Sequence, residues 1–374
     1  MLAMHETSIP LASFEVDFVV DVFVRSFEVK SMYRVCSMTF ALVVVLNWCS
    51  PLHAWNDAGH MTIARIAWDS MSVEERAAVV TILRKHPHLE SLLLKDRPAE
   101  ATEDEWIFLR AAVWADYVRP SKSTSPEDVP NHPLYKFHRG PWHYVNYPYT
   151  AGQSSSELPP KQLPNETNIL KQLDLSMEIL SGRTTSDVGR VADVSDDQNR
   201  AVRMTWLFHL VGDLHQPLHT AALIDQTLFP EPPYGDQGGN KLAIRADVNS
   251  MPKNLHWFWD EMFSTDSHFD QVCKQSERLT HDPAFSSEQL VELSVHPSFI
   301  SWAGESYAAA KTHVYQEGRL KLVLWEQLNA GTIPQSEVPS LTAEAMKDCR
   351  QLAERRVVLA GHRLAQRLKE IVKK

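Results

Sequence analysis

The chain has 374 residues, a formal net charge of −10, and a composition of 44% hydrophobic and 22% charged residues. This length is enough for one large domain or two ordinary ones with a full hydrophobic core. The negative charge argues against nucleic-acid binding through a broad basic surface, but it does not exclude a polyanion held by metal ions.

The first 54 residues have the pattern of a leader. Residues 1–31 mix charged and apolar side chains without periodicity, and we interpret them as an over-extended start. After Met32 a basic residue precedes a short apolar run, so residues 32–54 are predicted to be a secretory signal peptide. Lipoprotein cleavage before Cys49 is a weaker alternative. The apolar run is too short to span a membrane, so we expect a secreted or periplasmic protein that begins at Trp55 and keeps no transmembrane anchor.

Apolar periodicity and capping signals predict eight helices after the leader. Ser72 with Glu75 forms a capping box, and Asn56 or Asp57 and Asn254 are further N-cap candidates. The predicted helices cover residues 57–70, 73–83, 103–117, 165–181, 197–213, 255–263, 302–329 and 341–371.

The remaining segments are predicted to be loops with little strand. Residues 119–141 indicate a long surface loop, residues 142–146 a short extended segment, and residues 229–253 a turn-rich stretch. Within that stretch, residues 242–244 are expected to form a strand of a small hairpin. The predicted fold class is therefore all-α: one mostly helical domain over residues 55–374, with long loops and one small β-hairpin.

Three features of the sequence carry no chemistry by themselves. The basic residues of the last predicted helix are interpreted as a solvated scaffold with cations near a helix C-terminus. Cys273 and Cys349, the two cysteines outside the leader, could form a disulfide or stay free. Asn165 begins a glycosylation sequon, which matters only in a eukaryotic secretory host.

Potential metal ligands are concentrated in residues 206–219, WLFHLVGDLHQPLH. His209 and Asp213 are four residues apart, so a helix places them on one face, which points inward with its apolar neighbours. A buried His–Asp pair is costly unless each group has a partner, and a divalent cation is an effective partner. Pro217 ends the helix, so the chain can bring His219 back toward the same place.

Further candidate ligands occur elsewhere in the chain, at His60, Asp116, His143, His256 and Asp260. A single inward histidine is more often a hydrogen-bonded core residue, and we interpret His215, which lies off the ligand face, in that way. The segment that contains His256 repeats the His-x3-Asp device of residues 209–213. Two such pairs on inward helical faces predict a metal site, and imidazole with carboxylate favours zinc.

Taken together, these motifs resemble the trinuclear-zinc, single-strand-specific nucleases of the S-one/P-one type, relatives of the zinc-dependent phospholipases C. The resemblance runs from Trp55 to about Ser306 and includes the Trp-Ala-Asp, His-Tyr-Val-Asn, Gly-Gly-Asn and Asn-Leu-His-x3-Asp motifs. Residues 302–306 also look like a family segment and are expected to be structural. The resemblance implies a secreted endonuclease that cleaves single-stranded DNA and RNA to 5′-phosphate products. Whether 3′-nucleotidase activity accompanies this cleavage stays open.

The resemblance also implies three zinc ions per chain. The first would be held by Asp116, His143, His209 and Asp213. The second would be held by His219, His256 and Asp260. The third would be held by the amino nitrogen and carbonyl oxygen of Trp55, by His60, and by Asp213 as a bridge.

The same resemblance implies roles in catalysis and substrate binding for five residues. Arg119 would steady charge on the phosphoryl oxygens, although an exposed surface arginine is the alternative. Asp116 would orient the nucleophilic water, and Asp213 would hold the two zinc ions that activate it. Tyr144 would stack on a base and Asn146 would hydrogen-bond its edge, which only an unpaired base permits.

Two other functions use the same residues. A zinc-dependent phospholipase C is one, and the Tyr144–Asn146 pair argues against it. A secreted nucleic-acid-binding protein without catalysis is the other, and the complete ligand set argues against it. The implied partner is a single-stranded nucleic acid or nucleotide, with no stable protein partner. Residues 238–240, Gly-Gly-Asn, allow either a close backbone approach to the site or a plain tight turn.

Overall fold

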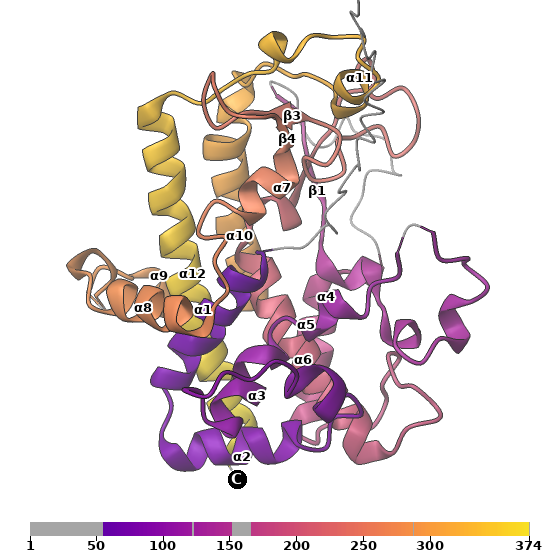
Figure 1. Cartoon of the computed structure of the whole chain (residues 1–374), viewed down its shortest axis with the longest axis vertical. Coiled ribbons are helices and arrows are strands. Elements are labelled where there is room, and N and C mark those ends of the chain that lie inside the picture. Colours follow the sequence, from indigo (N-terminus) through magenta and orange to yellow (C-terminus); the bar gives the residue numbers. More distant parts are fainter. Residues whose placement is uncertain (1–54, 122, 152–165, 287, 374) are drawn as a thin grey trace, which may run out of the picture. The chain divides into compact units, whose positions relative to one another are not determined.

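We describe the protein from a computed structural model in which residues 55–121, 123–151, 166–286 and 288–373 are described. The predicted leader and Asn165 of the sequon lie outside these residues. The helices of the described part are α1 (Asp57–Asp69), α2 (Val73–Leu83), α3 (Glu103–Ala111), α4 (Trp114–Tyr117), α5 (Ile169–Leu180), α6 (Asp196–His215), α7 (Leu255–Asp260), α8 (Phe269–Thr280), α9 (Glu292–Val295), α10 (Phe299–Ala309), α11 (Trp325–Asn329) and α12 (Ala343–Val372) (Figure 1).

Strands are few and short in the described residues. They are β1 (Tyr147–Tyr149), β2 (Ala221–Leu223), β3 (Ala243–Ile244) and β4 (Lys253–Asn254). β3 and β4 pair antiparallel, which confirms the predicted hairpin, whereas β1 and β2 form a parallel pair that the sequence analysis did not predict. The prediction of a mainly helical fold is confirmed.

Helices α1 and α2 begin at the side chains expected to cap them. The side chain of Asn56 accepts a hydrogen bond from the Gly59 N–H at 3.1 Å. Ser72 and Glu75 form both hydrogen bonds of a capping box. Each cap satisfies backbone donors that the first helical turn leaves without a partner.

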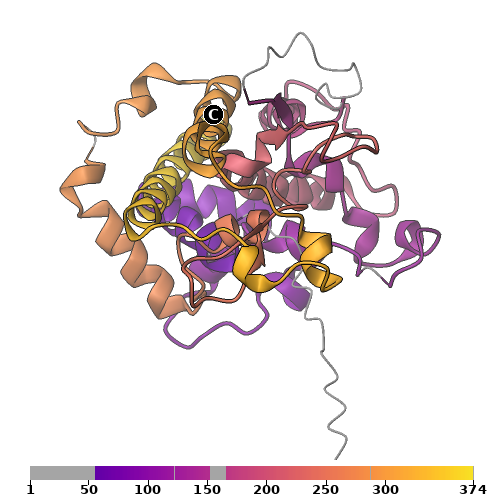
Figure 2. The same ribbon diagram turned by 90° about the horizontal axis from the view of Figure 1, so that it is seen from above.

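Helix α6 is the central element of the core. Its last fifteen residues, 201–215, are all buried, and it packs against α2, α5, α10 and α12 (Figures 1 and 2). The long helix α12 packs along α1 as well. At Gly361 of α12, a Cβ atom would lie 2.6 Å from Ile66, so glycine permits the close approach of these two helices. Any polar side chain in the second half of α6 is therefore enclosed by other helices.

Two predicted helices are broken in the structure. The pattern over residues 103–117 divides into α3 and α4, because the chain leaves the helix at Ala112 and Val113. The prediction of one helix over residues 302–329 is wrong, because α10 ends at Ala309. Positive φ angles at residues 316–318 then turn the chain before α11 begins. The sequence analysis also missed α8 and α9.

Smaller differences concern element boundaries. Residues 140–143 form a 3₁₀ turn, so the extended segment predicted over 142–146 begins only at Tyr144. Helix α5 begins after Asn168, whose side chain caps it, and α7 ends at Asp260 rather than at residue 263.

The basic residues of α12 are only partly a solvated face. Arg356 and Arg363 are buried, and both form ion pairs with Glu305 of α10. The interpretation of this helix as wholly solvated is therefore wrong for these two residues. Because Glu305 belongs to the 302–306 segment, the structural role expected for that segment agrees with this network.

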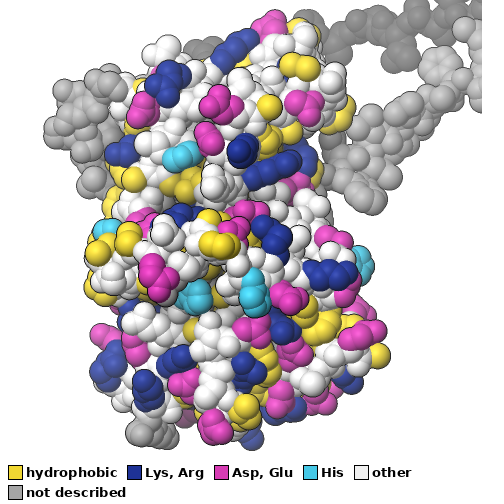
Figure 3. All heavy atoms as spheres, turned by 90° about the vertical axis from the view of Figure 1, so that its left-hand side faces the viewer, with side chains coloured by type: hydrophobic (Ala, Val, Ile, Leu, Met, Phe, Trp, Pro, Cys, Tyr) yellow, Lys and Arg dark blue, Asp and Glu magenta, His cyan; other side chains and the backbone are white. Residues whose placement is uncertain are grey.

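Figure 3 shows a face of the protein on which acidic and basic side chains are interspersed, without a broad basic area. Cys273 and Cys349 are both free thiols, so they do not form the disulfide considered above. Within the described ranges, no helix is both long and apolar enough to cross a membrane.

Candidate metal centre

The buried end of α6 supplies His209 and Asp213, which lie one turn apart. The Nε2 atom of His209 is 3.3 Å from Oδ1 of Asp213. The Nδ1 atom of His209 donates a hydrogen bond to the carbonyl of Ala112 at 2.8 Å, at the break between α3 and α4. This hydrogen bond fixes the tautomer, so that the lone pair of His209 is on Nε2 and faces Asp213.

The parallel pair of β1 and β2 brings two more histidines to this place. His143 lies shortly before β1, and His219 lies shortly before β2. The Nδ1 atom of His219 donates to the His143 carbonyl at 2.6 Å, and Nδ1 of His143 lies 2.9 Å from Oδ2 of Asp213. The predicted return of the chain after Pro217 is therefore present in the fold.

Helix α7 adds His256 and Asp260. The rings of His219 and His256 have centroids 4.9 Å apart, and Nε2 of His256 lies 3.8 Å from Oδ1 of Asp260. The Nδ1 atom of His256 donates to the carbonyl of Gly238 at 2.6 Å. Gly238 and Gly239 both have positive φ angles, and a Cβ on Gly238 would lie 2.6 Å from a backbone oxygen. The glycines thus serve both roles considered above, a tight turn and a close backbone approach.

His60 of α1 meets α6 at a glycine. Its ring stacks on His209 with centroids 4.2 Å apart, and its Nε2 atom lies 3.3 Å from Oδ1 of Asp213. A Cβ at Gly212 would lie 2.6 Å from the ring of His60. The glycine in the His-Leu-Val-Gly-Asp motif therefore provides the space that this histidine occupies.

Asp116 of α4 is buried beside the same group, and Arg119 lies at its edge. Oδ2 of Asp116 is 3.7 Å from Nε2 of His209. An amino nitrogen of Arg119 is 3.7 Å from Oδ1 of Asp116, and the Arg119 side chain is 23% exposed. Arg119 therefore lies at the boundary between the buried acid and solvent.

Ligand-type atoms of the centre lie within 4.8 Å of one another in three groups of residues. These groups are His60–Asp116–His209, His143–His209–Asp213 and His219–His256–Asp260. Asp213 contacts the most histidines, with Oδ1 near His60 and His209 and Oδ2 near His143.

Burial moves the protonation equilibria of these groups toward the neutral forms. It lowers the pKa values of His143 and His219 well below the ordinary histidine value and that of His256 to about 4. It raises the pKa values of Asp213 and Asp260 well above the ordinary carboxyl value, because a charged carboxylate is costly in a low-dielectric interior. Neutral imidazole is the form that binds a metal, and a cation would offset the cost of ionising the two acids.

The donor set fits a divalent cation. Several of its buried atoms have no hydrogen-bond partner among the described residues: both carboxylate oxygens of Asp116, Nε2 of His143, Oδ1 of Asp213, Nε2 of His219 and Oδ2 of Asp260. Buried polar atoms are almost always satisfied. In addition, three imidazoles donate Nδ1–H to backbone carbonyls, which is the usual outer arrangement around zinc-bound histidine.

Residues 55–373 match the family model described as S1/P1 Nuclease. The chain belongs to this family. It is 25% identical to Endonuclease 4 of Arabidopsis thaliana over 229 residues, which cover 60% of this chain and 60% of that protein. It is 23% identical to Endonuclease 3 of the same plant over 224 residues, which cover 59% of this chain and 58% of that protein. The chain thus spans about three fifths of the length of these curated relatives.

The family match confirms the resemblance inferred from the motifs and extends it. It continues beyond Ser306, where the motifs end, into α12. Helix α12 is tied to the end of α6, because Nε of Arg356 donates to the carbonyl of His215 at 3.1 Å. His215 itself is hydrogen-bonded to Arg363 and to the Val211 carbonyl, in agreement with the structural role expected for it.

Tyr144 and Asn146 follow His143 on an extended segment beside the centre. The backbone of Tyr144 is extended, and the N–H groups of Val145 and Tyr147 donate to successive carbonyls of the segment that leads into β2. This ladder places alternate side chains on opposite faces, so Tyr144 and Asn146 share one face. Both side chains are partly exposed, whereas Val145 is buried.

Trp55, the expected first residue of the mature protein, is fully buried. The N–H of the next residue, Asn56, donates to the Asp260 carbonyl at 3.2 Å. The Asn56 amide donates to the Ser264 carbonyl at 2.5 Å. These contacts hold the start of α1 against the end of α7.

Two buried polar residues near the centre were missed by the sequence analysis. Asp236 accepts hydrogen bonds from the Leu223 N–H and the Tyr315 hydroxyl, and burial raises its pKa to about 6. Gln216 donates to Asp260. No local pattern marks Asp236, but Gln216 is a polar residue inside the ligand motif, and its place there was a usable signal.

Proposed function

We propose that this protein is a zinc-dependent endonuclease that hydrolyses single-stranded DNA and RNA to 5′-phosphate products. The observation that carries the proposal is the gathering of eight buried His and Asp side chains into three adjoining groups, four of whose histidines lie against Asp213. A partly exposed segment with Tyr144 and Asn146 lies next to them. Membership of the nuclease family supports the reaction class. Secretion or export to the periplasm is part of the proposal.

Three zinc ions would be held by the sets named above, with Asp213 shared between the first and the third. Bound zinc supplies positive charge to the phosphoryl oxygens and lowers the pKa of a coordinated water. The protein contributes the rest from its own groups. Asp116 would orient the attacking water through its carboxylate, and the Arg119 guanidinium would donate to a phosphoryl oxygen from the solvent side.

Single-strand preference has a physical source in the segment after His143. A base that stacks on Tyr144 and hydrogen-bonds to Asn146 must be both unstacked and unpaired. Asn146 offers a donor and an acceptor, so its amide can pair with the edge of more than one base. The base pairs of a duplex would have to open before a base could reach Tyr144 and Asn146.

One assay with four substrates tests the function: single-stranded DNA, RNA, duplex DNA and a phosphatidylcholine analogue. We expect hydrolysis of both single strands, slower hydrolysis of the duplex, and 5′-phosphate ends by mass spectrometry. Cleavage of the lipid alone would indicate a phospholipase C. Binding of single strands without cleavage by zinc-loaded protein would indicate a catalytically inactive binding protein.

Replacement of Tyr144 tests the stacking role. Tyr144→Ala should lower kcat/KM for single-stranded DNA by about 5- to 150-fold, because base–aromatic stacking contributes about 1–3 kcal/mol. Tyr144→Phe keeps the ring and should retain most activity. A phosphodiester without a base, such as bis(p-nitrophenyl) phosphate, should be hydrolysed equally by all three proteins. A matching loss on that substrate would show that Tyr144 supports the metal centre instead.

A further inference from the structure

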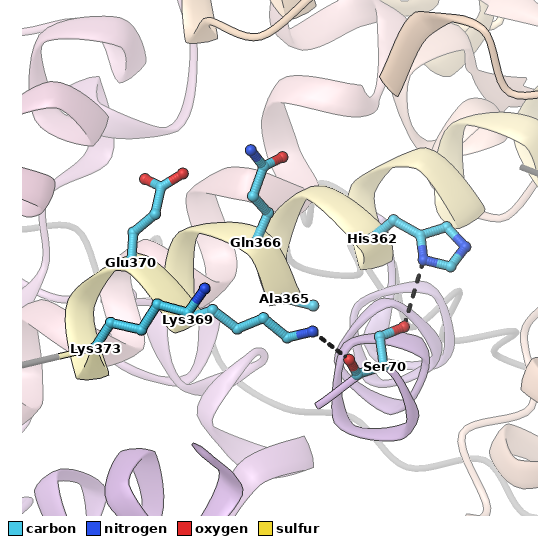
Figure 4. Close-up of a pocket in the computed structure, with 7 residues that line it drawn as sticks. All are labelled: Ser70, His362, Ala365, Gln366, Lys369, Glu370 and Lys373. Carbon is cyan, nitrogen blue, oxygen red and sulfur yellow. Dashed lines mark hydrogen bonds between the residues drawn. The ribbon is translucent and has the colours of Figure 1, made fainter. Parts of the chain in front are cut away.

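Polar groups outside the metal centre mostly satisfy one another. A hollow of about 500 Å³ between the ends of α1 and α12 is an example (Figure 4). There, the ammonium of Lys369 donates to the Ser70 carbonyl at 2.6 Å, and Nδ1 of His362 lies 3.4 Å from the Ser70 hydroxyl. Gln216 differs, because its side chain pairs with a residue of the metal centre and has no role in the ligand sets.

The amide of Gln216 is fixed at both ends. Gln216 is the C-cap of α6 and is fully buried. Its carbonyl oxygen accepts a hydrogen bond from the Leu218 N–H, in the turn that begins at Pro217. Because the Leu218 N–H occupies the carbonyl oxygen, the orientation of the Gln216 amide is fixed. Its NH₂ group points to Asp260 and donates to Oδ1 at 2.8 Å.

This hydrogen bond makes the two oxygens of the Asp260 carboxylate different. Oδ1 is occupied by Gln216, whereas Oδ2 is buried without a hydrogen-bond partner among the described residues. Oδ1 also lies 3.8 Å from Nε2 of His256, so Gln216 holds the carboxylate at the oxygen that faces this histidine, and Oδ2 keeps unpaired lone pairs. Rotation of this carboxylate would break the hydrogen bond to Gln216, so the amide favours one orientation of the Asp260 side chain.

Gln216 also joins two parts of the centre that are distant in sequence. It lies three residues after Asp213 and three before His219, and it reaches Asp260 across 44 residues. The same short turn thus provides one ligand of the cluster and orients another. Among the described residues, no other side chain donates a hydrogen bond to the Asp260 carboxylate.

We propose that Gln216 is a positioning residue that fixes the orientation of the Asp260 carboxylate and so sets the zinc affinity of the His219–His256–Asp260 cluster. The inference rests on the proposed function, because it requires zinc at that cluster. Gln216 touches neither substrate nor metal and acts only through Asp260. Outer-layer hydrogen bonds of this kind change metal affinity by about 10- to 100-fold.

Two substitutions separate the two hydrogen bonds of the amide. Gln216→Glu keeps an acceptor for the Leu218 N–H but loses the donor to Asp260 and adds a like charge. Gln216→Met keeps the length and removes both. Ser306→Ala is the matched control, because Ser306 is equally buried and donates to the Leu214 carbonyl of α6 at 2.5 Å without touching a ligand residue.

The readout is a zinc titration against a chromophoric chelator, with metal content and circular dichroism measured on each protein. We expect one of three zinc ions to weaken by about 10- to 100-fold in both Gln216 variants and none in Ser306→Ala. His256→Ala should show which zinc ion that is. Wild-type affinity in the two folded Gln216 variants, or an equal loss in Ser306→Ala, would overturn the inference. A wild-type protein that binds no zinc would contradict the proposed function itself.

Discussion

Replacement of Asp213 by alanine should remove two zinc ions at once and lower the rate of single-strand cleavage by more than about 10³-fold. The expected size follows from geometry, because one carboxylate contacts His60 and His209 through Oδ1 and His143 through Oδ2. Every other ligand belongs to one zinc position only, so its loss would leave the other two positions complete. Zinc content per chain, measured by plasma mass spectrometry, should fall from three to one.

Stability measurements separate metal loss from misfolding in the Asp213 variants. Burial raises the pKa of Asp213, so the charged carboxylate is a cost to the metal-free fold. Metal-free Asp213→Asn should therefore melt no lower than metal-free wild type, whereas the zinc-loaded wild type should melt higher than both. His215→Asn is the control on the same helix, because His215 pairs with Arg363 instead of the centre. Full zinc content and activity in folded Asp213→Ala would contradict the bridging role.

The helices that sequence could predict are those whose signals are local. Asn56 and Ser72 act through backbone groups three residues away, so their caps could be recognised without the fold. The break after α10 could not, because Gln316 and Glu317 adopt positive φ angles although neither residue type favours them. Next to this turn, the Tyr315 hydroxyl donates to the buried Asp236 carboxylate, a contact across 79 residues.

The metal centre likewise contains features with a local sequence signal and features that depend on contacts distant in sequence. The His-x3-Asp pairs could be found because helical periodicity places both groups on one face. The groups that orient them could not be found in this way. The Ala112 carbonyl reaches His209 across 97 residues, and the Gly238 carbonyl reaches His256 across 18. Such partners depend on packing, and a backbone carbonyl carries no residue-type signal at all.

The position of Trp55 is set by the fold around it. Its side chain is fully buried, and a Cβ at Gly59 would lie 2.7 Å from the Cβ of Trp55. Asn56 is hydrogen-bonded to the end of α7 through both its backbone and its side chain. The main-chain nitrogen of Trp55 is therefore held in place whether or not a residue precedes it, and only its chemical form changes on cleavage.

A protein that retains one residue before Trp55 should lack the third zinc ion and cleave single strands about 10²- to 10³-fold more slowly. A peptide nitrogen has no available lone pair for a metal, whereas a free amine has one, and loss of one charge-stabilising group costs about that factor. Zinc content and rate should be compared for proteins that begin at Trp55 and at Ala54, with N-terminal sequencing of each. His60→Ala is the control: because it removes the same zinc ion, the extra residue should then have no further effect. Equal zinc content and equal rates for the two lengths in the wild-type background would show that the Trp55 amine is not a ligand.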